Sequence, residues 1–157
     1  MAFILPIEDE AATGETGCAR PRRFRNAVMR DAPWDRLPAA NQLVVAVARR
    51  WRAARNSGEI AQPHISALLT GDDCAVLSPV FDSLLTLFEA ALGRPVAVGT
   101  AIPLSDDESL LLGLLDGSKR RRACIECNEG AANALDCALC STRIMMALAI
   151  PARHTVH

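Results

Sequence analysis

The chain has 157 residues, half of them apolar, and a formal net charge of −1 at pH 7. This length suits one domain, or one domain with a tail, and the apolar share is sufficient for a hydrophobic core, which excludes a largely disordered polymer. A charge so close to zero gives no whole-protein electrostatic attraction toward nucleic acid or a membrane.

The sequence shows no targeting or membrane-spanning segment. The apolar run at residues 3–7 is too short for the core of a secretory signal, and acidic residues follow it directly at 8–10. Charged residues interrupt every long apolar window, so we expect a cytoplasmic protein without membrane contact. A reducing cytoplasm disfavours structural disulfides and leaves the six cysteines for metal binding, redox chemistry or burial.

The first strong helix signal follows an acidic N-terminal stretch at residues 1–19, which we expect to be a flexible arm. A helix is predicted at 39–56, because apolar residues recur there at every third or fourth position. Its apolar stripe consists of Ala40, Leu43, Val44, Val47, Trp51 and Ala54. A short helix is expected to follow Pro63 and to end at Gly71.

Ser78 and Pro79 are typical of a helix start, with serine as the N-cap and proline in the first turn. This helix is expected to run to about Leu92, where Gly93 ends it. Residues 94–104 contain two prolines and are predicted to cross the molecule as an extended segment.

Ser105 and Glu108 have the spacing of a capping box at the start of a leucine-rich helix predicted at 106–116. An acidic metal site is an alternative interpretation of this stretch, although capping accounts for every residue in it. A basic hinge at 118–123 and a final helix at about 131–149 complete the predicted elements.

These elements predict an all-α fold, a small helical bundle of about four to five helices with a C-terminal four-cysteine element made of a knuckle and a helix. We divide the chain into the flexible arm at 1–19, a helical domain at 20–117, a cysteine-bearing helical element at 118–150 and a tail at 151–157.

The C-terminal third contains two Cys-x-x-Cys pairs separated by nine residues: Cys124, Cys127, Cys137 and Cys140. Structural zinc takes four such ligands at tetrahedral corners, and a short connection brings the pairs together at little entropic cost. Asn128 stands where a zinc knuckle usually has glycine, and asparagine tolerates the positive φ of that turn. We expect the segment 118–128 to fold back and cover the cysteine-bearing side of the last helix.

Three other interpretations of these cysteines remain open. Four thiolates also hold iron–sulfur clusters, and Cys-x-x-Cys pairs serve in thiol–disulfide or redox switches. Unligated cysteines behave as small apolar residues and pack in helical cores. Cys18 and Cys74 lack such a partner, and His154 and His157 lie in the tail, where we expect them to be solvated.

No catalytic constellation is apparent, because the motifs of nucleophilic, nucleotide-binding and metal-dependent enzymes are missing. A four-thiolate zinc also has no open coordination position to activate water. The sequence therefore predicts a non-enzymatic regulatory or adaptor protein, with structural zinc in its C-terminal element and a protein as its partner. A redox-responsive or iron–sulfur protein is the first alternative.

The basic run Lys119, Arg120, Arg121 and Arg122 supports a second alternative, a DNA- or RNA-binding regulator. The near-neutral charge, the scarcity of aromatic residues for stacking and the missing recognition-helix signature argue against it. A spare apolar surface on the last helix would equally suit a homodimer contact.

Overall fold

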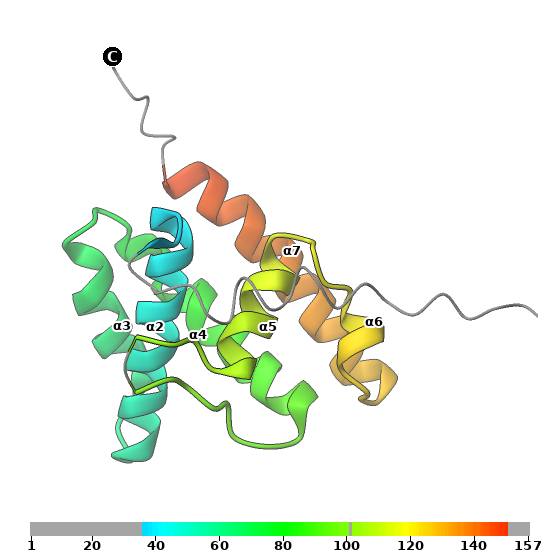
Figure 1. Cartoon of the computed structure of the whole chain (residues 1–157). Coiled ribbons are helices and arrows are strands. Elements are labelled where there is room, and N and C mark those ends of the chain that lie inside the picture. The colour runs from blue at the N-terminus through cyan, green and yellow to red at the C-terminus, as the bar shows by residue number, and fades with distance from the viewer. Residues whose placement is uncertain (1–35, 101, 151–157) are drawn as a thin grey trace, which may run out of the picture.

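The structure is a computed structural model that describes residues 36–100 and 102–150 (Figure 1). Within these residues it contains six α-helices and no strand, which confirms the all-α fold class. The elements are α2 (Ala39–Asn56), α3 (Ala61–Thr70), the 3-10 turn η2 (Ala75–Leu77), α4 (Ser78–Leu92), α5 (Asp106–Leu115), α6 (Arg121–Cys124) and α7 (Glu129–Ala149). The predicted arm at 1–19, the tail at 151–157, Cys18, His154 and His157 lie outside the described residues.

Helix α2 begins and ends where its hydrophobic stripe predicts. Val44, Val47, Trp51 and Ala54 of that stripe are buried. Helix α2 packs against α3, α4 and α5, while α4 also packs against α3 and α7. Figure 1 shows α2, α3 and α4 as one group, with the long helix α7 running past it. The buried side chains form a single core cluster that extends from α2 to α7.

The two ends of α4 differ in how well the sequence predicts them. Gly93 adopts a left-handed conformation with φ of 65° and ends the helix, as predicted. Ser78 is not the N-cap, because η2 runs directly into α4 and makes Leu77 the capping residue. The Ser78 hydroxyl instead donates to the carbonyl of Gln62 at 3.0 Å, which attaches the start of α4 to α3.

The first turn of α5 confirms the predicted capping box. The Ser105 hydroxyl accepts from the Glu108 N–H at 3.0 Å, and the Glu108 carboxylate accepts from the Ser105 N–H at 2.8 Å. The same carboxylate binds Arg49 of α2, with 2.6 Å between Nε and Oε1. Residues 94–104 cross the molecule without forming a strand among their described positions and lead into this turn.

Asp107 forms a second ionic contact in that turn. Arg94 donates two hydrogen bonds to its carboxylate, at 2.6 and 2.7 Å, and the Ala97 N–H donates a third at 2.8 Å. Burial raises the pKa of Asp107, but these hydrogen bonds outweigh burial and leave the pKa below its usual value. Both buried carboxylates therefore connect elements of the fold, and the acidic metal-site interpretation gains no support.

The segment Ala75–Leu92, which comprises η2 and α4, has a mean hydropathy of 1.5 over 18 residues, enough to cross a membrane by length and composition alone. Core helices satisfy the same criterion, and α4 buries Phe81, Leu84 and Phe88 among others. The expectation that this protein makes no membrane contact therefore stays a prediction.

Candidate functional site

The four cysteines of the predicted zinc site lie on three consecutive parts of the C-terminal region. Cys124 ends α6 and is exposed, Cys127 is half-buried in the following segment, and Cys137 and Cys140 are exposed on α7. No group of three or more His, Cys, Asp or Glu side chains within residues 36–100 and 102–150 is arranged to hold a metal ion. The four thiols therefore do not form a ready-made metal site within the described residues. The zinc site stays a prediction, which metal analysis tests.

The start of α7 differs from the predicted knuckle. Asn128 has φ of −62° and ψ of 157°, and it is the N-cap of α7, accepting a hydrogen bond from the Ala131 N–H at 2.8 Å. Asparagine is among the preferred N-cap residues, which explains why α7 begins at Glu129 rather than at 131. The predicted left-handed turn at Asn128 is therefore wrong. Residues 121–124 also form the short helix α6 instead of a hinge.

The cysteine-bearing side of α7 is uncovered within the described part of the chain. Leu135 and Leu139 are buried, but Cys137 and Cys140 are exposed, as are Ile144 and Leu148. The expectation that residues 118–128 cover this side is wrong. The segment instead contacts α7 through the ion pair between Arg121 and Asp136. The homodimer alternative for the apolar surface of α7 stays a prediction.

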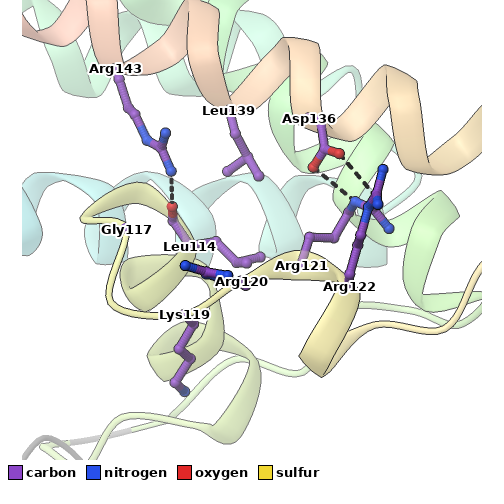
Figure 2. A pocket seen from close by; sticks show the side chains of 9 residues that line it. All are labelled: Leu114, Gly117, Lys119, Arg120, Arg121, Arg122, Asp136, Leu139 and Arg143. Atoms are coloured by element: carbon purple, nitrogen blue, oxygen red, sulfur yellow. Dashed lines mark hydrogen bonds and ion pairs between the residues drawn. The ribbon is translucent and has the colours of Figure 1, made fainter.

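The segment that carries the basic run and the facing side of α7 line an open pocket of about 440 Å³, which we call the basic pocket (Figure 2). Five of its side chains are cationic and one is a carboxylate. The lining residues are Leu114, Gly117, Lys119, Arg120, Arg121, Arg122, Asp136, Leu139 and Arg143. Figure 2 shows Asp136 reaching from α7 toward Arg121 on the opposite wall, while Arg143 reaches from α7 to Leu114.

Arg121 attaches one wall of the pocket to the other. Its guanidinium donates two hydrogen bonds to the Asp136 carboxylate, at 2.8 Å from Nε and 2.9 Å from Nη2. The hydrogen bond to Asp136 raises the pKa of Arg121 despite the opposing effect of burial, and Cys127 adds to the rise. The hydrogen bond from Arg121 lowers the pKa of Asp136, and the positive charges of Arg122 and Arg143 lower it further.

Arg143 and Lys119 are held by the backbone of α5. Arg143 donates to the carbonyls of Leu114 and, at 2.9 Å, Leu115, at the helix end where the dipole is negative. Lys119 donates its backbone N–H to the Gly113 carbonyl at 2.8 Å and its ammonium to the Ser109 carbonyl at 3.3 Å. Part of the predicted basic run therefore serves the fold.

Arg120 and Arg122 are the basic-pocket cations left for a ligand. Both are exposed, and neither side chain makes a hydrogen bond or ion pair within the described residues. Arg122 acts on Asp136 only through its charge. These two guanidinium groups lie beside Arg121 and Arg143, so the pocket has an uncompensated positive charge at its opening.

The arginines of α2, by contrast, are largely neutralised by other parts of the chain. Arg49 binds Glu108, while Arg52 and Arg55 both bind Glu89, at 2.7 and 3.2 Å. Arg55 also lies over the Trp51 ring, 4.8 Å from its centre. Arg50 is exposed. A further arginine-rich stretch, at residues 20–25, lies outside the described residues.

The sequence indicates one wall of the basic pocket but not the other. The basic run from Lys119 to Arg122 is apparent in it, whereas Asp136, Leu139 and Arg143 of α7 are not. These three positions are spaced i, i+3 and i+7, which places them on one helix face. That spacing was the available signal, although the sequence does not show that this face meets the basic run.

The Arg121–Asp136 ion pair predicts a dependence of stability on acid. The pKa of Asp136 is lowered in the folded state, so its contribution is fully present above the unfolded pKa of about 3.9 and is lost as the pH falls through the lower folded value. We expect wild type to be more stable than Asp136→Asn near neutral pH, with the two converging in acid. Urea unfolding between pH 7 and about pH 2 measures this, and a constant difference would contradict it.

Comparison with known proteins gives no relative of this chain. No protein-family model, no curated protein and no solved structure matches it. The function is therefore inferred from the site alone.

Metal analysis tests the zinc prediction. We expect about one zinc ion per purified chain. The zinc should be lost in both Cys124→Ser and Cys137→Ser, because each variant removes one ligand of a four-thiolate site. Cys74→Ala is the matched control. Cys74 is buried, and its thiol contacts the carbonyls of Asp72 and Ala149 rather than either cysteine pair. A brown, iron-containing preparation would favour the iron–sulfur alternative, and metal content unchanged in both serine variants would contradict a shared site.

Proposed function

We propose that this protein is a non-enzymatic regulatory or adaptor module whose basic pocket binds an acidic segment of a partner protein. The observation that carries the proposal is the pair of exposed arginines, Arg120 and Arg122, at the opening of a pocket with five cations and one carboxylate. Arginine binds carboxylates through a planar fork of donors, and such charge-assisted hydrogen bonds are stronger than neutral ones.

The pocket already contains one example of the recognition that we propose. Arg121 holds the Asp136 carboxylate through two parallel hydrogen bonds, and this pair fixes the backbone that presents Arg120 and Arg122. The lining of the pocket includes no serine, cysteine or histidine, so it lacks the residues of the commonest nucleophile–base pairs. These features support a binding site in preference to a catalytic one.

A protein partner agrees better with the charge distribution than a nucleic acid does. Nucleic-acid affinity accumulates over many phosphate contacts along a basic track. The arginines of α2 do not extend such a track, because Glu89 and Glu108 neutralise three of them. The aromatic side chains within the described residues, Trp51, Phe81 and Phe88, are buried and offer no stacking surface.

A labelled acidic peptide of alternating Glu and Gly tests this proposal by fluorescence anisotropy, with a Gln-and-Gly peptide as the uncharged reference. We expect the acidic peptide to bind and the reference not to bind. Arg120→Ala/Arg122→Ala should weaken binding by about tenfold, because each exposed ion pair contributes up to about 1 kcal/mol.

Arg50→Ala is the matched control, because it removes an exposed arginine from α2, outside the pocket. Equal losses in the control and the pocket variant would show that overall charge, not the pocket, attracts the peptide. Tighter binding to a duplex or single-stranded DNA probe, abolished by the pocket variant, would replace the protein partner with a nucleic acid.

A further inference from the structure

The donors of the basic pocket come from two opposite walls. Arg120 and Arg122 project from one side, and Arg143 projects from α7 on the other (Figure 2). Arg143 uses Nε and Nη2 on the carbonyls of α5 and retains Nη1 for a ligand. A carboxylate presents two oxygens in one plane and cannot use donors on opposite sides equally well, whereas a phosphate presents three oxygens around a tetrahedral centre.

The net charge of the pocket also favours a phosphate over a carboxylate. After Arg121 is paired with Asp136, the pocket retains four positive charges that have no carboxylate partner, and a dianion compensates two of them. One carboxylate would compensate only one of them. The carbonyls of Leu114 and Leu115, which would repel an anion, are already bound by Arg143.

We infer that the partner segment carries a phosphate monoester, which Arg120, Arg122 and Arg143 bind together in the basic pocket. This inference rests on the proposed function and specifies the chemical group that is recognised. The volume of about 440 Å³ accommodates a phosphorylated side chain with part of its backbone. The protein would then bind its partner in the phosphorylated state and release it after dephosphorylation.

A phosphorylated protein fits this pocket better than a nucleic acid strand or a lipid surface. The pocket is a single hollow between α7 and one short segment, so it holds one phosphate group rather than a row of them. The double charge of a monoester also exceeds the single charge of each phosphodiester in a nucleic acid backbone.

Three labelled peptides that differ at one position test the inference: the same short acidic sequence with serine, aspartate or phosphoserine at its centre. We expect the phosphoserine peptide to bind about tenfold more tightly than the aspartate peptide. Arg122→Ala should weaken phosphoserine binding more than aspartate binding, because the three oxygens of the phosphate use donors from both walls, whereas the two oxygens of a carboxylate do not. Circular dichroism of each variant verifies that the fold is intact, and Arg50→Ala again controls for overall charge.

The pH dependence of binding gives a second readout. A phosphate monoester acquires its second negative charge near pH 6, so we expect affinity for the phosphoserine peptide to rise between about pH 5 and 7.5. Affinity for the aspartate peptide should stay nearly constant over that range. The charged groups that face the ligand are Lys119, Arg120, Arg121 and Arg122 on one wall and Asp136 and Arg143 on the other. The lowered pKa of Asp136 keeps its carboxylate ionised across this range.

The outcomes separate this inference from the proposed function. Equal affinity for the aspartate and phosphoserine peptides, without a pH effect, would overturn the inference and leave the acidic-segment proposal standing. No pocket-dependent binding to any of the three peptides would overturn both. A phosphorylated oligonucleotide or an anionic phospholipid vesicle that binds more tightly than the phosphoserine peptide would also overturn the inference.

Discussion

Replacing Arg49 by alanine is expected to lower the free energy of unfolding by about 3–5 kcal/mol, because it leaves a buried charge without its partner. The Glu108 side chain is only 1% exposed, and its carboxylate accepts hydrogen bonds from Nε and Nη2 of Arg49. The same carboxylate completes the capping box of α5. Loss of Arg49 therefore weakens the contact between α2 and α5 as well as the start of α5.

The surroundings of Arg49 leave little room for compensation. A Cβ atom at Gly99 would lie 2.7 Å from Nη2 of Arg49 and 2.5 Å from the Pro103 carbonyl oxygen, so the crossing segment packs closely on this ion pair. Urea unfolding followed by circular dichroism measures the effect. Arg50→Ala, the adjacent exposed position, should change stability by less than about 0.5 kcal/mol.

A double variant tests the physical reason for this loss. Adding Glu108→Gln to Arg49→Ala removes the buried charge and retains a side chain that can cap the helix. We expect the double variant to be more stable than Arg49→Ala alone. The account would be contradicted if Arg49→Ala were as stable as Arg50→Ala. It would also be contradicted if the stability losses of Arg49→Ala and Glu108→Gln simply added in the double variant.

Replacing Leu135 by alanine is expected to cost about 2–5 kcal/mol and to destabilise the described helices as one unit. Leu135 of α7 is fully buried, and it belongs to the same core cluster as Trp51 of α2 and Phe88 of α4. Because α7 packs on α4, a cavity at Leu135 weakens the common core. Tryptophan fluorescence and circular dichroism should report the same shifted transition.

Asn133→Ala is the matched control for this prediction, because Asn133 is exposed on the same helix. Its effect should be within about 0.5 kcal/mol of wild type. Two separate transitions in Leu135→Ala, with α2 and α4 retained after α7 unfolds, would instead support the division of the chain into a helical domain at 20–117 and an independent element at 118–150.

Most of the fold could be predicted because its signals are local. The stripe of α2, the capping box of α5 and the left-handed Gly93 each depend on residues within a few positions of one another, and each is confirmed. The Ser78 prediction was wrong because the preceding residues form a 3-10 turn and Gln62, from another helix, accepts the hydroxyl hydrogen bond.

The candidate site was harder to predict because its residues meet through tertiary contacts. Asn128 suits both a left-handed turn and an N-cap, and only the structure shows that it begins α7. The pairing of Arg121 with Asp136 then determines which face of α7 meets the segment 118–128. Neither hydrophobic periodicity nor cysteine spacing contains that information, so the basic run was identified without its opposite wall.

The dependence of α4 on α7 also has a consequence for the protein during its synthesis. Helix α7 is the last described element of the chain, yet it covers one side of α4. Together, η2 and α4 have a mean hydropathy of 1.5. Until residues 129–149 have left the ribosome, the nascent chain exposes that apolar side. A product truncated before Glu129 should therefore aggregate and be degraded more rapidly than the full-length protein.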